Sequence, residues 1–146
     1  MIQRVQSIYL LLAAAAAFAL FALAFVNVSG ATGEIAAFQD GDFDINDNMV
    51  LKIMTIVCGA MALLNIFLFN NRKLQINIGK FVMLLNVVLA GLAGFFLYQT
   101  MGGASIDLAP NGGFAMPLLA IIFTFLANKG IDKDEKLVKS AYNRLR

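Results

Sequence analysis

Four apolar stretches dominate this sequence and constrain its fold more than any other feature. They cover residues 8–28, 50–69, 81–98 and 113–127. The first has no charged residue, and at about 1.5 Å of helix rise per residue it can cross a hydrocarbon core of about 30 Å. The chain is 60% hydrophobic and only 14% charged, which excludes an ordinary soluble domain. We therefore predict an all-α integral membrane protein, with an antiparallel up-down four-helix transmembrane bundle in residues 1–128.

Two of the stretches allow a second interpretation. The first follows a basic residue, Arg4, as a cleaved signal peptide does. Its apolar run exceeds the about 7–15 residues of such a signal, so we expect a retained span. The fourth stretch is short and contains Pro117, which a helix tolerates in its first turn. This stretch either crosses a locally thinned bilayer or forms a re-entrant segment.

Basic residues gather on one side of the predicted bundle. Every Lys and Arg except Lys52 lies before the first stretch, between the second and third, or after the fourth. Most of the acidic residues lie in the two alternate connections. Because positively charged loops stay in the cytoplasm, we predict a multi-pass protein with both termini cytoplasmic and the acidic loops outside.

Residues that carry common catalytic chemistry are scarce. The chain has no His and a single Cys, Cys58. This composition excludes disulfides within the chain, Cys/His zinc sites and histidine-based catalysis. The centres of the apolar stretches also hold none of the ionisable groups that proton relays use. We therefore expect no enzymatic activity, no cofactor and no metal site.

Two asparagines are the strongest polar candidates inside the spans. Asn65 lies near the end of the second stretch and Asn86 near the start of the third. If these stretches form a hairpin, the two amides sit at matching depth and form an interhelical polar pair, worth about 0.6–2 kcal/mol. The alternative is that they contact a ligand or an ion.

Small residues mark candidate helix-packing faces. They recur at helical spacing in three of the stretches, where they let backbones approach closely, either within the bundle or against a partner protein. The positions that we single out are Ala15, Ala19, Gly59, Ala90 and Gly94.

The first outer connection carries alternating carboxylates between Asp40 and Asp47. A calcium loop would need Gly at its sixth position and Glu at its twelfth, but Ile45 and Leu51 stand there. We expect a solvated acidic loop, with calcium binding as the alternative.

Residues 129–146 form a basic tail with helical patterning. Asp132 and Glu135 fit a capping box, and Leu137 and Val138 begin an apolar spacing of three and four residues. We predict a short amphipathic helix that either anchors the chain to anionic lipids or docks on a partner protein. Nucleic-acid binding is not expected, because the dispersed charges form no groove-reading element.

Three segments together resemble a known family. They are the opening MIQRVQSIYL of residues 1–10, the turn NRKLQ of 71–75, and the tail from LANK at 126–129 through KDEKLVK at 133–139 to RLR at 144–146. The chain resembles the Bacteroidota four-span membrane family of unknown function DUF4293. The resemblance implies a bacterial inner-membrane location but no catalytic residues. It also implies that the turn and the tail share a cytoplasmic surface. We expect this surface to bind a partner protein or lipids, and its residues are Arg72, Lys73, Lys133, Lys136, Lys139, Arg144 and Arg146.

Three functions remain open at this point. The sequence favours a non-enzymatic accessory or scaffold subunit of a larger inner-membrane complex, in contact with other membrane proteins and anionic lipids. The alternative is a small homo-oligomeric transporter or channel with Asn65 and Asn86 lining the path. A membrane enzyme or lipid-handling protein would need convergent polar groups, which the sequence does not reveal.

Overall fold

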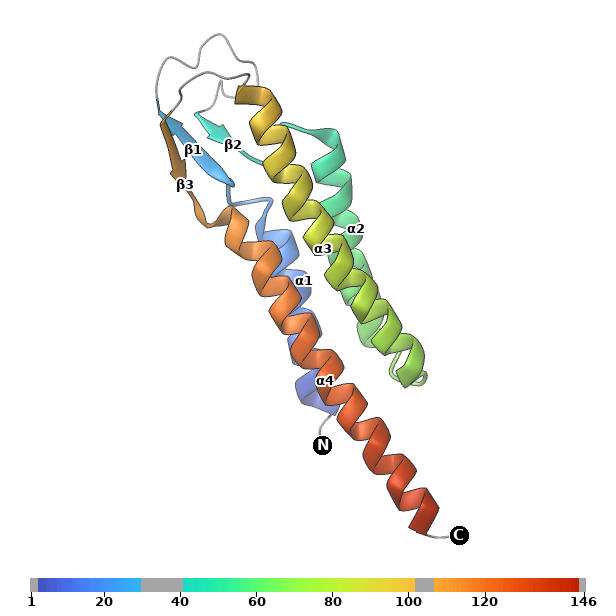
Figure 1. Cartoon of the computed structure of the whole chain (residues 1–146). Helices are drawn as coiled ribbons and strands as arrows, with labels where there is room; N and C mark the ends of the chain where they lie inside the picture. The colour runs from blue at the N-terminus through green and yellow to red at the C-terminus, as the bar shows by residue number, and fades with distance from the viewer. Residues whose placement is uncertain (1–2, 30–40, 102–106, 145–146) are drawn as a thin grey trace.

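Four helices pack into an antiparallel bundle, which confirms the predicted fold class (Figure 1). The computed structural model describes residues 3–29, 41–101 and 107–144. Each helix packs against two others, so that α1 and α3 are diagonal to each other, as are α2 and α4. The helices are α1 (Gln3–Ala19), α2 (Met49–Phe67), α3 (Arg72–Met101) and α4 (Ala115–Arg144).

A small antiparallel sheet covers one end of the bundle (Figure 1). Its strand order is β2-β1-β3, and Val26 of β1 pairs with Phe43 on one side and Pro110 on the other. A short 3-10 helix, η2, leads from β3 into α4. The bounds are β1 (Val26–Ser29), β2 (Asp42–Phe43), β3 (Asp107–Pro110) and η2 (Gly112–Phe114).

Asparagine side chains cap the N-termini of α2 and α3. The Asn48 Oδ1 accepts a hydrogen bond from the Val50 backbone N–H at 2.9 Å, and the Asn71 Oδ1 accepts one from Leu74 N–H at 3.3 Å. Each bond satisfies a helix-terminal N–H that has no partner within its helix. Only residues 68–71 connect α2 to α3, and α3 begins at Arg72 rather than near residue 81.

The predicted first span is wrong in its extent. We expected it to run over residues 8–28, but α1 ends at Ala19 and the chain then turns into β1. Phe25 and Val26 are buried beneath and within the sheet, not exposed to lipid. An apolar residue has the same hydropathy whether protein or lipid covers it. The length of the apolar run therefore overestimated the length of the membrane span.

The fourth apolar stretch and the basic tail form one helix. α4 continues without interruption from Ala115 to Arg144, across the boundary at residues 128 and 129. The separate helix expected to begin at Asp132 is thus the last part of α4. The helix continues through Gly130, a poor helix former, where the Gln6 side chain of α1 packs against it, because tertiary packing overrides local propensity. With this continuation, Gly112–Ser140 is long and apolar enough to cross a membrane.

The bundle has the dimensions and surface of a membrane protein. Three described helices are long and apolar enough to span a bilayer, and Val5–Ala19 of α1 is a shorter apolar helix. Large apolar side chains on all four helices face outward, including Ile8, Ile53, Leu84 and Ile122. Lipid tails would cover this surface at no hydrophobic cost.

Candidate functional site

Polar side chains are buried at the end of the bundle opposite the sheet. Every helix contributes at least one of them: Gln6 from α1, Asn65 from α2, Gln75 from α3, and Asn128 and Asp134 from α4. We call these five residues the polar layer. A buried polar group costs free energy unless it is hydrogen-bonded, so the partners of these side chains decide what the layer can do.

The charged member of the layer is bound by an amide. Asp134 is only 9% exposed, and its Oδ2 accepts a hydrogen bond of 2.6 Å from the Gln6 Nε2. These residues are 128 positions apart, so the bond ties the start of α1 to the last part of α4. A hydrogen bond to a charged group contributes about 1.5–3 kcal/mol, which is substantial for one contact.

A glycine allows Asn128 to approach α3. A Cβ atom at Gly79 would overlap the Asn128 amide, so no larger residue fits there without a shift. The Asn128 Nδ2 donates to the Ile76 carbonyl at 3.4 Å. The Asn128 Oδ1 is buried and accepts no hydrogen bond from the described residues.

On the α2–α3 side of the layer, the side-chain amide of Asn65 forms no hydrogen bond with the described residues. The Gln75 Nε2 donates to the backbone carbonyl of Asn65 at 3.1 Å. The side chain of Asn65 is buried, and neither its Oδ1 nor its Nδ2 forms a hydrogen bond within the described part of the chain. With the Asn128 Oδ1, the layer thus offers unused donor and acceptor capacity suited to a water molecule or a small polar ligand.

The predicted hydrogen-bonded pair of Asn65 and Asn86 is wrong. Both residues are buried, but the Asn86 Nδ2 donates to the Val82 carbonyl of its own helix at 2.9 Å. Gln75 and Asn86 both lie in α3, eleven residues apart. Asn86 is therefore about 16 Å farther along the helix than Gln75. The residue at the depth of Asn65 is Gln75.

Sequence reasoning missed four members of the polar layer. Gln75 fell in a segment that we assigned to a loop, and Asn128 and Asp134 were placed at or beyond the end of the fourth span. A helical spacing of three and four residues does continue from Asn86 back through Val82 and Gly79 to Gln75. That spacing was the available signal, because all of these positions are buried.

The predicted basic surface lies at the same end of the bundle as the polar layer. Lys73, Lys133, Lys136 and Lys139 are exposed, and Arg72 is half-buried. Two ion pairs lie along α4, Lys136 with Asp132 at 2.7 Å and Lys139 with Glu135 at 2.6 Å. Solvent screens these pairs at the lysine ends, so they add little to the stability of the helix. Arg144 belongs to α4, whereas Arg146 lies outside the described residues.

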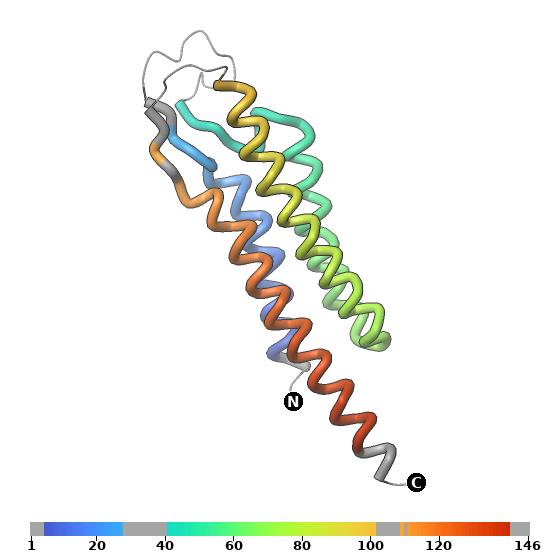
Figure 2. The backbone as a smooth tube through the Cα atoms, in the orientation of Figure 1, coloured from blue at the N-terminus to red at the C-terminus, as the bar shows by residue number. Residues whose placement is uncertain are grey.

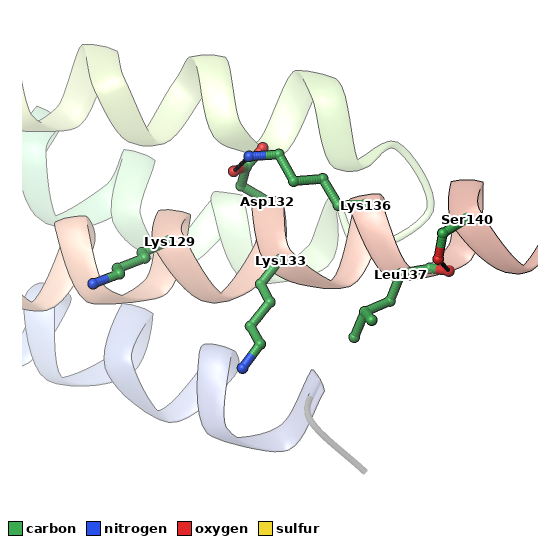
Figure 3. Close-up of a pocket in the computed structure, with 6 residues that line it drawn as sticks. All are labelled: Lys129, Asp132, Lys133, Lys136, Leu137 and Ser140. Carbon is green, nitrogen blue, oxygen red and sulfur yellow. Dashed lines mark hydrogen bonds and ion pairs between the residues drawn. The ribbon is translucent and has the colours of Figure 1, made fainter.

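One face of this surface forms a shallow groove of about 480 Å³. Figure 3 shows Lys133 pointing away from the Asp132–Lys136 ion pair. All of the lining residues come from α4, so the groove is an outer helix face and not an enclosed site. They are Lys129, Asp132, Lys133, Lys136, Leu137 and Ser140.

The five small residues have different surroundings. Gly59 is buried, and a Cβ there would lie 2.6 Å from the Phe18 ring, so this position serves packing within the chain. A Cβ at Gly94 would meet no atom within 4 Å. Ala15 is exposed, and Ala19 and Ala90 are half-buried. Gly94 and Ala15 thus leave space at the outer surface of the bundle.

In the described part of the acidic loop, carboxylates accept hydrogen bonds from residues of the same loop. The Asp44 carboxylate accepts hydrogen bonds from the Asn46 backbone N–H at 2.6 Å and from the Asn46 Nδ2 at 2.7 Å. The Asp47 carboxylate accepts one from the Asp44 N–H at 2.7 Å. Asp40 lies outside the described residues. The described ranges contain no group of three side chains that could hold a metal ion.

Comparisons with known proteins identify a family and no function. No curated protein and no solved structure matches the chain at significant similarity. One family profile, described as a domain of unknown function (DUF4293), matches residues 2–145. This match covers nearly the whole sequence and agrees with the resemblance of the opening, the turn and the tail. The chain therefore belongs to the DUF4293 family.

Proposed function

We propose that this chain is a non-enzymatic accessory or scaffold subunit of a bacterial inner-membrane protein complex. The observation that carries the proposal is the last part of α4, which extends past the start of α1 and past the α2–α3 turn (Figures 1 and 2). In this extension Leu137 is 52% exposed and Val138 is 57% exposed. An exposed amphipathic helix end that no other described segment covers is suited to a partner protein.

A second surface supports docking within the membrane. Gly91 is exposed on α3, and a Cβ at Gly91 or Gly94 would meet no atom within 4 Å. Small residues on an outer helix face let another transmembrane helix approach closely, with van der Waals contact as the driving force. A partner could therefore engage both the membrane-embedded face and the projecting tail.

Purification in mild detergent tests this role. We expect the wild-type chain to recover a defined set of membrane proteins in fixed ratio, and the Leu137→Ser/Val138→Ser variant to lose them. Met49→Ser is the matched control, because Met49 is 75% exposed at the other end of the bundle. Crosslinking of native membranes that yields only contacts of the chain with itself would contradict the proposal.

The proposed location has both termini and the α2–α3 turn in the cytoplasm. The chain suits cysteine mapping because its single Cys, Cys58, is buried. Lys73→Cys places a thiol beside the turn, and Ala109→Cys places one at an exposed position of β3. We expect a membrane-impermeant maleimide to label only the second variant in intact cells, with the parent chain as control. Labelling of Lys73→Cys in intact cells would reverse the topology.

A transport function is the second candidate, and the unused amide groups of the polar layer favour it. Asn65 and Asn86 are both buried inside one chain, so they would line a path through a single bundle and not the centre of a homo-oligomer. Solute flux in proteoliposomes that Asn65→Leu abolishes would support this candidate. The subunit proposal expects no flux in either protein.

A further inference from the structure

A second groove, of about 470 Å³, lies between α3 and α4. Lys80 and Met83 line it from α3, and Phe125, Asn128 and Lys129 line it from α4. Unlike the outer face of α4, this groove has walls from two helices. It therefore offers a ligand contacts on both sides.

Two lysines of the groove have no ionic partner in the part of the chain that the structure describes. Lys80 and Lys129 are exposed, and neither forms an ion pair with another described residue. The acidic group at the edge of the groove, Asp132, is bound to Lys136 at 2.7 Å. The positive charge of the two lysines is therefore not neutralised within the described chain, and an anion would complement it.

The position of the lysines along the helices indicates a membrane interface. No charged residue follows Lys80 in α3, and no charged residue precedes Lys129 in α4. Each lysine thus marks the border of an apolar segment, where a long side chain reaches the headgroup level. Met83 and Phe125 lie about one turn deeper on their helices and give the groove an apolar floor.

We infer that this groove binds an anionic phospholipid, with its phosphate between Lys80 and Lys129 and an acyl chain along Met83 and Phe125. A cationic pair above an apolar floor matches a molecule that carries its negative charge at the water boundary and its hydrocarbon below it. A free phosphate would use the lysines but not the floor. This site goes beyond the proposed subunit role and does not depend on the projecting tail.

A tryptophan reporter tests the inference, because the chain has no Trp of its own. Phe125→Trp places the indole in the groove, and Leu64→Trp places it on the outer face of α2 as a control. The two positions have similar exposure, 55% and 60%. Each variant is reconstituted into phosphatidylcholine vesicles that contain an equal fraction of brominated phosphatidylglycerol or brominated phosphatidylcholine, and quenching is measured.

We expect brominated phosphatidylglycerol to quench the groove reporter far better than brominated phosphatidylcholine, with no such preference at the control position. Lys80→Gln/Lys129→Gln should reduce the relative affinity by about fivefold for each lysine removed. Lys73→Gln/Lys133→Gln removes equal charge outside the groove and should retain the preference. Equal quenching by the two lipids at the groove, or a preference that survives the loss of Lys80 and Lys129, would overturn the inference.

Discussion

The two ends of the bundle are built in different ways. At the sheet end, the ring of Phe25 packs against Phe43 and Phe114 with centroid distances of 6.1 and 4.9 Å. Backbone bonds add to this packing, with Phe25 N–H donating to the Phe43 carbonyl at 2.8 Å. At the polar end, single side-chain bonds join the helices and the Asn65 amide has no partner among the described residues. The comparison indicates that the sheet end provides stability, while the polar end retains unused hydrogen-bonding capacity.

The largest effect is expected at the sheet end. Phe25→Ala should cost about 3–5 kcal/mol of unfolding free energy, because it removes a fully buried ring and leaves a cavity. Thermal unfolding in detergent measures the change. Phe69→Ala, at a position 55% exposed, is the matched control and should have little effect. Equal losses of unfolding free energy in the two variants would contradict the conclusion that packing at the sheet end provides stability.

A smaller loss is expected from the charged bond at the polar end. Gln6→Leu removes the amide donor of the buried Asp134 carboxylate and should cost about 3 kcal/mol. Gln6→Leu/Asp134→Leu should recover most of that stability, because it leaves no buried charge. If the double variant is as unstable as the single one, the pair contributes through packing rather than through its hydrogen bond.

Two glycines of α3 separate close packing from open surface. Gly79→Ala should cost about 2 kcal/mol, because its Cβ would overlap the Asn128 amide. Gly91→Ala meets no atom within 4 Å and should stabilise the helix by about 0.5–1 kcal/mol. Both changes add the same methyl group to the same helix. Opposite signs in thermal unfolding support the packing of Asn128 against Gly79, whereas equal signs contradict it.

The smallest effect probes the unused amide. Asn65→Leu should stabilise the detergent-solubilised chain by about 1 kcal/mol, since it removes buried polar atoms that make no hydrogen bond with the described residues. Asn86→Leu is the control and should cost about 0.5–1 kcal/mol, because it removes the bond to the Val82 carbonyl. A clear loss of stability in Asn65→Leu would contradict this expectation.

The sequence was sufficient to predict the helices but not what lies at their ends. Long apolar runs predicted the four-helix bundle, because only a helix satisfies the backbone polar groups of such a segment in lipid. The sheet was missed, since β1 lies within an apolar run and pairs with residues far away in the chain. The polar layer was missed because Gln75 and Asp134 become buried only when α3 and α4 extend beyond their apolar segments.

The continuity of α4 has a mechanical consequence. Its unbroken length of 30 residues makes a rod of about 45 Å that leads directly from η2 to the projecting tail. The N-terminus of α4 is held in place, because the Gly113 N–H donates a hydrogen bond of 3.0 Å to the Ala24 carbonyl just before the helix begins. A displacement of the tail would therefore reach the strands at the other end of the bundle through one continuous helix.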